Sequence, residues 1–346
     1  MSIDPLKLIR PNIAALVPYA SARDEYKGKE GVFLDANEHP VDSGLNRYPD
    51  PYQHEVKEMF GALRGIDPAK ILFGNGSDEV IDLIFRAFCI PGKDNVIVLP
   101  PTYGMYKVSA GINDVEVREV LLNEQFQPEV SEILAKADSN SKVLFICSPN
   151  NPSGNVIFGD RILQLIREFP GIVVVDEAYI DFCPDQSMVP ALDRFPNLII
   201  MQTLSKAWGL AGIRMGIMMA SPQIIAVMNK IKPPYNINIM TQRIALEALK
   251  KVEHKNKTIQ EVLVQREWLK MELLQLTCVE MVYPSDANFL LVRFTDPKKV
   301  FAYLIAHKII VRDRSTQPRC EGALRITVGT AAENIALIEV LKTIEN

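Results

Sequence analysis

The chain has 346 residues, of which 48% are hydrophobic and 23% are charged, and its formal net charge is -4. This composition is that of an ordinary globular protein with enough apolar material for a large core, and chains of this length often divide into two domains. The mild acidic balance and the lack of a lysine- and arginine-rich run argue against a nucleic-acid-binding surface.

The cysteine and histidine positions indicate neither a disulfide framework nor a metal centre. The five cysteines are far apart, odd in number and form no C-x-x-C pair, so a reducing compartment is predicted. The four histidines show no metal-ligand spacing, and we expect no metal. The first residues lack the apolar run of a signal peptide, and no stretch has the length of a membrane span. These features predict a soluble, cytoplasmic protein that binds no membrane.

From residue 52 onward, strand-like and helix-like segments alternate. Helical spacing predicts helices over residues 78–88 and 160–169. Continuous Val/Ile/Leu runs predict buried strands, and five such runs span residues 95–100, 142–149, 171–179, 197–206 and 215–221. Apolar runs separated by helices are typical of an α/β fold with a mainly parallel sheet and helices on both faces.

The two ends of the chain have different patterns. Prolines interrupt residues 1–30, which we expect to form an N-terminal arm. Residues 51–245 form the predicted large domain, and residues 31–50 are assigned to the small domain as its N-terminal segment. A charged helical stretch, short alternating strands and a last helix predict a smaller α+β domain over residues 246–346.

Polar residues follow three of the predicted strands, and a glycine-rich turn precedes the first large helix. In open parallel sheets, ligands bind beyond the carboxyl ends of the strands. Each segment alone has an ordinary explanation as a turn, a helix cap or a solvated lysine, but their joint position at strand ends is hard to explain by chance. The segments contain Gly76-Ser77-Asp78, Asn151, Asp176 with Tyr179, and Ser205-Lys206 with Arg214.

In order and content, these segments resemble the fold-type I pyridoxal-phosphate aminotransferases. The resemblance implies an α/β large domain with a mainly parallel sheet flanked by helices, plus a smaller α+β C-terminal domain. It implies that Lys206 attaches pyridoxal 5'-phosphate through its amine and later moves a proton. Asp176 would pair with the ring nitrogen, and Tyr179 and Asn151 would hydrogen-bond the ring hydroxyl. Tyr103 would stack on the ring face.

The same resemblance implies a site for the cofactor phosphate at the start of a helix. The backbone N–H groups of Gly76, Ser77 and Asp78 would donate to the phosphate, assisted by the helix dipole. Ser205 and Arg214 would complete this site, the arginine through a charge-assisted fork. The side chains that open the helix, those of Asp78 and its neighbour Glu79, are predicted to point away from the anion.

Further motifs along the chain resemble the histidinol-phosphate aminotransferases, which exchange an amino group between histidinol phosphate and 2-oxoglutarate in histidine biosynthesis. They include Pro18-Tyr19, Asn46-Arg47-Tyr48-Pro49, Pro101-Thr102-Tyr103-Gly104-Met105-Tyr106, Val311-Arg312-Asp313-Arg314 and Leu324-Arg325-Ile326. The resemblance implies a homodimer in which Tyr48 reaches the cofactor phosphate of the other subunit. It implies that the substrates contact Tyr19, Asn151, Arg312 and Arg325.

Alternatives remain open from the sequence. Another fold-type I aminotransferase acting on aromatic amino acids would keep the same central residues. A phosphate-recognising pyridoxal-phosphate decarboxylase, such as a threonine-phosphate decarboxylase, would use the same scaffold to break a carbon–carboxylate bond. A non-catalytic regulator is disfavoured because all the catalytic residue types are present. Trp208, Ser153 and His39 depart from residues familiar in the family, but none removes a catalytic group.

Overall fold

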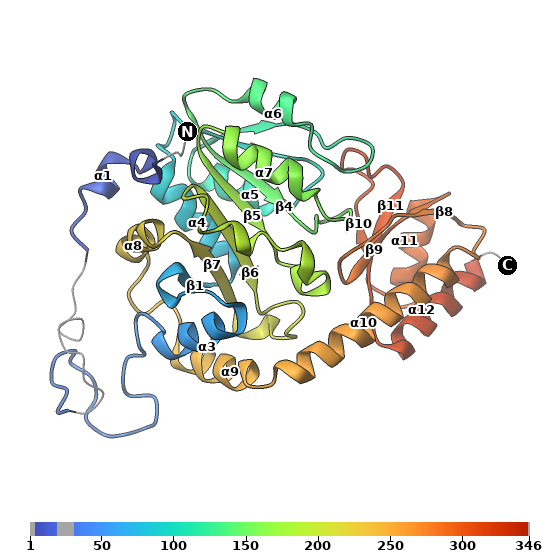
Figure 1. Ribbon diagram of the computed structural model, residues 1–346. Helices are drawn as coiled ribbons and strands as arrows, with labels where there is room; N and C mark the ends of the chain where they lie inside the picture. The colour runs from blue at the N-terminus through green and yellow to red at the C-terminus, as the bar shows by residue number, and fades with distance from the viewer. Residues whose placement is uncertain (1–3, 19–30, 345–346) are drawn as a thin grey trace.

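The computed structural model describes residues 4–18 and 31–344. Figure 1 shows a large sheet with helices on both faces and a smaller sheet on the other side of the molecule. The long helix α10 (Val252–Leu273) runs from the helix α9 (Ile239–Leu249) to the smaller sheet. This arrangement confirms the predicted α/β fold class with its second, smaller α+β part.

The large sheet is mainly parallel. Its strand order is β1-β7-β6-β5-β4-β2-β3, and among these strands of the described chain β7 alone runs in the opposite direction, antiparallel to both β1 and β6. The strands are β1 (Ile71–Asn75), β2 (Asn95–Val98), β3 (Glu116–Glu119), β4 (Ser141–Cys147), β5 (Ile172–Asp176), β6 (Leu198–Thr203) and β7 (Met215–Ala220). All five predicted apolar strands are present, but the direction of β7 differs from the parallel arrangement expected for it.

Two apolar layers cover the two faces of this sheet. The helices α3 (His54–Arg64), α6 (Val130–Lys136), α7 (Gly159–Glu168) and α9 contribute to one layer. The helices α4 (Ser77–Phe88), α5 (Met105–Ile112) and α8 (Pro222–Ile231) contribute to the other. The strands between them are buried almost throughout, except for the edge strand β3, as expected for a doubly covered sheet. The short segments η1 (Pro5–Leu8) and α1 (Pro11–Ala14) lie near α8.

The smaller sheet is antiparallel, with the strand order β10-β11-β9-β8. Its elements are β8 (Val279–Val282), β9 (Phe289–Phe294), β10 (Arg312–Asp313), β11 (Ala323–Thr327), α11 (Pro297–Ala306) and α12 (Ala331–Ile344). Leu324 and Ile326 pack in the core beneath α11 and α12, whereas Ala323 packs in the core of the large sheet. One face of the smaller sheet is therefore turned towards the large domain.

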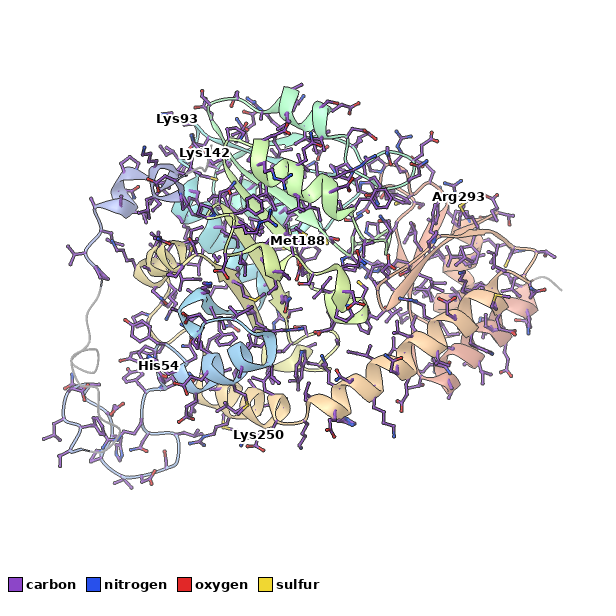
Figure 2. The ribbon with its side chains drawn as sticks, in the orientation of Figure 1. His54, Lys93, Lys142, Met188, Lys250 and Arg293 are labelled. Atoms are coloured by element: carbon purple, nitrogen blue, oxygen red, sulfur yellow. The ribbon has the colours of Figure 1, made fainter. Side chains whose placement is uncertain are left out.

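The predicted domain bounds stay a prediction, and two contacts bear on them. Residue 245 lies within α9, whose Ala245 packs in the core of the large sheet. The chain bends after this helix at Lys250, which Figure 2 labels. Residues 31–50 lie on the side away from the smaller sheet (Figure 1), where the Arg243 side chain donates to the Gly44 carbonyl (3.4 Å).

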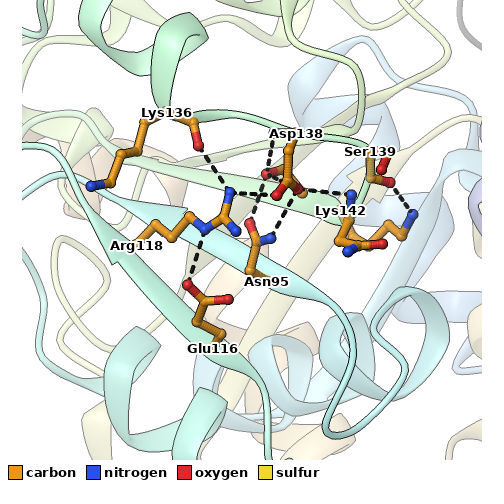
Figure 3. A network of polar contacts seen from close by, with 9 residues as sticks. Asn95, Glu116, Arg118, Lys136, Asp138, Ser139 and Lys142 are labelled. Atoms are coloured by element: carbon orange, nitrogen blue, oxygen red, sulfur yellow. Dashed lines mark hydrogen bonds and ion pairs between the residues drawn. The ribbon is translucent and has the colours of Figure 1, made fainter.

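A polar network ties together the amino ends of the parallel strands (Figure 3). Arg118 on β3 bonds Glu116 at 3.0 Å and Asp138 at 2.8 Å. Asp138 also accepts a hydrogen bond from Asn95, the first residue of β2, at 3.1 Å. These side chains bond to one another at the amino ends of the strands. The pocket described below lies at the opposite, carboxyl ends of the strands.

None of the described helices combines the length and the apolar character needed to cross a bilayer. Among the described residues, no group of three or more His, Cys, Asp or Glu side chains is arranged to hold a metal ion.

Candidate active site

A pocket opens at the carboxyl ends of β5 and β6, beside the start of α4. It brings together most of the predicted cofactor-binding side chains. The lining residues are Ser77, Asp78, Tyr103, Cys147, Asn151, Asp176, Ala178, Tyr179, Thr203, Ser205, Lys206 and Arg214. The strand-end reasoning therefore located residues that are distant in sequence but adjacent in space.

A buried carboxylate belongs to this pocket. Asp176 ends β5 and is 3% exposed. Its Oδ1 accepts a 3.1 Å hydrogen bond from the Ala178 N–H, and its Oδ2 accepts a 2.6 Å bond from the Tyr106 hydroxyl. Burial raises the pKa of Asp176, and the Tyr106 bond opposes that rise. No role was predicted for Tyr106; its position at the start of α5, three residues after Tyr103, was the available signal.

Lys206 lies on the wall of the pocket just after β6. Its Nζ is 5.6 Å from the centroid of the Tyr179 ring. Removal from water lowers the pKa of Lys206, Arg325 lowers it further, and Asp176 opposes the change. A lysine in this environment is more readily neutral than a surface lysine, and a neutral amine is nucleophilic.

Asn151 links the large domain to the smaller sheet. Its Oδ1 accepts a 2.5 Å hydrogen bond from Arg325 Nη1, and its Nδ2 donates to the Tyr179 hydroxyl at 3.4 Å. The Arg325 guanidinium carbon also lies 5.3 Å from the centroid of the Phe289 ring. These contacts place Arg325 within reach of the pocket, and its predicted role in substrate binding stays a prediction.

The turn before α4 forms a narrow cradle beside Arg214. Gly76 has a φ of 78°, and a Cβ atom there would lie 2.5 Å from Arg214 Nη2. The Gly76 N–H donates to the Arg214 carbonyl at 2.8 Å, which ties the turn to the backbone of Arg214. The prediction that this N–H donates to a phosphate was therefore wrong, because the carbonyl already accepts its proton. Ser77 begins α4, where the first N–H groups of a helix have no partner within the helix. This is a favourable site for a phosphate.

The side chains of the first turn of α4 point in different directions. Glu79 accepts a 2.9 Å bond from Asn236 Nδ2 and lines no part of the pocket. Asp78 instead accepts a 3.2 Å bond from the Tyr103 hydroxyl and lies 3.6 Å from Arg214 Nη2. The prediction that Asp78 points away from the anion site was therefore wrong, because Tyr103 and Arg214 attract its carboxylate.

The predicted residues outside this pocket fall into separate places. Arg312 is exposed on β10, directly opposite Arg325 on β11. Tyr48 stacks on Tyr235 with ring centroids 4.4 Å apart and does not line the pocket. Tyr19 lies outside the described residues.

Comparison with known proteins decides the family. The sequence model of the class I and II aminotransferases matches residues 26–341. A histidinol-phosphate aminotransferase from Cytophaga hutchinsonii is 55% identical over 341 residues, covering 97% of this chain and 98% of the relative. The chain belongs to the histidinol-phosphate aminotransferases, within the pyridoxal-phosphate-dependent class I and II aminotransferases.

Two solved structures share the fold of this family. The histidinol-phosphate aminotransferase from Clostridium acetobutylicum has a TM-score of 0.81 at 23% identity, covering 88% of this chain and 92% of that one. The enzyme from Sinorhizobium meliloti, in complex with pyridoxal-5'-phosphate, has a TM-score of 0.79 at 22% identity, covering 86% and 84%. At these identities, the likeness bears on the fold alone.

The residues of the pocket fit the cofactor of this family. A Cβ at Gly76 would collide with Arg214, so the cradle between them depends on a glycine. A cationic guanidinium and the free N–H groups of a helix start suit a phosphate. A buried carboxylate, that of Asp176, suits a protonated ring nitrogen, and Lys206 in the same pocket supplies an amine for the aldehyde.

Proposed function

We propose that this chain catalyses the reversible transfer of an amino group between L-histidinol phosphate and 2-oxoglutarate. The products are imidazole-acetol phosphate and glutamate, and the reaction belongs to L-histidine biosynthesis. The observation that carries the proposal is the 2.5 Å bond from Arg325 to Asn151, which holds an anion-binding guanidinium beside the pocket of Lys206. The similarity to histidinol-phosphate aminotransferases over nearly the whole chain supports the choice of substrate.

The roles of the pocket residues follow from their chemistry. When bound, pyridoxal phosphate supplies the electron sink for the charge that develops on the substrate carbon. Lys206 holds the cofactor through its amine and carries a proton to and from that carbon, which requires the lowered pKa described above. Asp176 holds the proton on the ring nitrogen by an ion pair. Tyr179 and Asn151 orient the ring hydroxyl.

The remaining pocket residues hold the phosphate and the ring. The N–H groups of Ser77 and Asp78 form the phosphate site together with the side chains of Ser205 and Arg214, while the Gly76 N–H is bonded to the Arg214 carbonyl. Tyr103 stacks against the ring and keeps it from tilting. The hydrogen bond from Tyr103 to Asp78 supports this role, because it fixes the direction of the phenol.

Both substrates bring an anion to the same guanidinium groups. Histidinol phosphate carries a phosphate ester, and glutamate carries a side-chain carboxylate. Arg325 and Arg312 lie opposite each other on adjacent strands and can both face one anion. Asn151 adds an amide, and Tyr19 adds a phenol from the arm. A planar guanidinium binds either anion in bidentate fashion.

The proposal includes a homodimer with shared active sites. Val32, Leu34 and Val41 of the 31–50 segment are 88%, 88% and 66% exposed. An apolar segment this exposed favours burial against a second subunit. Tyr48 lies in the same segment and would then reach the cofactor phosphate of the partner. A cytoplasmic location remains a prediction that suits a biosynthetic enzyme.

A product assay tests the function directly. The purified protein, loaded with pyridoxal phosphate, is incubated with L-histidinol phosphate and 2-oxoglutarate, and glutamate is measured with time. We expect glutamate to form at a rate that depends on both substrates. Phenylalanine replaces histidinol phosphate in a parallel reaction, and a higher kcat/KM for phenylalanine would assign the chain to aromatic amino acids instead.

A further inference from the structure

Alternate residues of the β10–β11 pair carry arginines on one face. Arg312 lies directly opposite Arg325 in the antiparallel register. The Arg314 N–H donates to the Ala323 carbonyl at 3.0 Å, which continues the pairing by two residues. Opposite residues share a face of a sheet, and so do residues two apart along a strand. Arg312, Arg314 and Arg325 therefore project from the same face.

This face is the one turned towards the pocket. Leu324 and Ile326, which alternate with Arg325, pack in the core of the smaller domain. Ala323 packs in the core of the large sheet, and Arg325 reaches across to Asn151. Since Arg314 lies opposite Ala323, the Arg314 side chain projects from the face of the smaller sheet that is turned towards the large domain. On β9, the strand that flanks β11 opposite to β10, Arg293 pairs with Ala323, and Figure 2 labels Arg293.

The three guanidinium groups have no carboxylate partner among the described residues. Asp313, between two of them, accepts from the N–H and hydroxyl of Ser315 instead. The Arg314 Nε atom is buried and has no hydrogen-bond partner in the described part of the chain. Burial, followed by the charges of Arg325 and Arg312, lowers the pKa of Arg314.

This cluster needs an anion. A guanidinium in a protein does not escape repulsion by losing its proton, so three like charges on one face of a strand pair favour the binding of an anion. Arg325 and Arg312 are already assigned to the anion that both substrates share. Arg314 adds a further fork of donors on the same face, two residues beyond Arg312, and a further acceptor on a substrate would be its partner.

We propose that Arg314 is a specificity-determining residue that binds the phosphate ester of the phosphorylated substrate more strongly than the carboxylate of glutamate. A phosphate monoester carries a charge of about -1.5 to -2 and three acceptor oxygens, whereas a carboxylate carries one charge and two oxygens. The third guanidinium matches the extra oxygen and the extra charge. This inference rests on the proposed function, because it concerns the same anion site.

The test is a comparison of Arg314→Gln with Arg319→Gln in the cofactor-loaded enzyme. Arg319 lies in the same connection and is exposed, and its side chain forms a 3.7 Å ion pair with Glu124, so the control removes the same charge outside the site. For Arg314→Gln, we expect KM for histidinol phosphate to rise about tenfold or more and KM for glutamate to rise less than about threefold. The control variant should change neither by more than about twofold.

Inorganic phosphate gives a second measurement that does not depend on the substrate assignment. In the cofactor-loaded enzyme, phosphate should inhibit the glutamate half-reaction, and Arg314→Gln should weaken that inhibition about tenfold. Arg314→Lys keeps the positive charge but loses the paired donors of the guanidinium, so phosphate should inhibit it more strongly than it inhibits Arg314→Gln. If wild-type enzyme fails to use histidinol phosphate, the proposed function falls, and the phosphate result still decides the role of Arg314. Equal rises in both KM values, or unchanged phosphate inhibition, would overturn the inference.

Discussion

The hydroxyl of Tyr106 donates a 2.6 Å hydrogen bond to Asp176 Oδ2, and both side chains are buried. The Tyr106 ring is fixed by stacking on Phe145, with centroids 4.7 Å apart. Burial alone would push Asp176 towards its neutral form, and the phenol opposes this. Tyr106 therefore acts as a positioning residue, because its bond favours the ionised form of the carboxylate and fixes the orientation of Asp176 in the pocket.

Replacing Tyr106 with Phe should weaken cofactor binding. Loss of a hydrogen bond to a buried carboxylate is worth about 1.5–3 kcal/mol, so we expect the dissociation constant of pyridoxal phosphate to rise at least tenfold, about 1.4 kcal/mol. Because the pKa of Asp176 rises further in this variant, the cofactor should be released at a higher pH on acidification than in the wild type. Equilibrium dialysis across pH measures both effects. Tyr283→Phe, a phenol outside the pocket, is the control, and equal behaviour of the two variants would contradict the role of Tyr106.

Lys206→Ala should abolish turnover and covalent attachment of the cofactor. Borohydride reduction followed by intact-mass measurement should show cofactor fixed to the wild type and none fixed to the variant. Lys250→Ala, at the exposed bend after α9, is the matched control and should behave as the wild type. A cofactor adduct on the Lys206→Ala chain would mean that another lysine carries it.

Arg325→Gln should impair both half-reactions, since both substrates bring an anion to this guanidinium. Its loss also leaves the Asn151 oxygen without its partner. We expect kcat/KM for histidinol phosphate and for glutamate to fall about a hundredfold each, about 2.7 kcal/mol. Stopped-flow absorbance of each half-reaction provides the measurement. A normal glutamate half-reaction in this variant would exclude a shared anion site.

Mixed dimers test whether Tyr48 acts across an interface. Tyr48→Ala should lower activity at limiting cofactor, and Lys206→Ala should be inactive. In a mixed dimer, the site that keeps Lys206 receives an intact Tyr48 from the other chain. Co-expression with two different tags and tandem purification should therefore restore one working site per dimer. If the cofactor affinity of the mixed dimer stays as weak as that of Tyr48→Ala, Tyr48 does not act on the active site of the other subunit.

The buried Lys57 gives a prediction about stability. Burial, assisted by Lys232 and opposed by Asp50, lowers the pKa of Lys57 to about 8. Between that value and the unfolded value of 10.5, the unfolded chain binds more protons than the folded chain, so this residue's contribution to stability rises with pH. Lys57→Met should therefore raise the free energy of unfolding at pH 7 by about 1–3 kcal/mol. Urea unfolding at pH 7 and pH 10 checks this, and an advantage that fails to shrink at pH 10 would contradict it.

The sequence predicted some strands of the large sheet and missed others. The apolar runs predicted the central strands because strands covered on both faces need no polar alternation. They missed β3, whose residues are partly exposed at the sheet edge, and β1, which is short and contains a glycine. The direction of β7 was not readable, since a buried strand has the same composition in either direction.

The directions of the side chains were the part of the site that the sequence could not predict. Residues at strand ends could be placed near one another from topology alone, and Lys206, Asp176, Asn151 and Arg214 do line one pocket. The turn of Asp78 towards Tyr103 depends on partners distant in sequence. The bond from Tyr106 to Asp176 and the face that Arg314 shares with Arg325 likewise need the packed structure.

The most direct test of the central claim is an absorbance titration of the cofactor-loaded protein. L-histidinol phosphate is added first and 2-oxoglutarate second, while the visible band of the lysine-bound cofactor is followed. The account predicts that the band falls with histidinol phosphate and returns with 2-oxoglutarate. A band that does not respond to histidinol phosphate but falls with glutamate would contradict the substrate assignment. A protein that shows no such band after reconstitution would contradict the role of Lys206 and of the whole pocket.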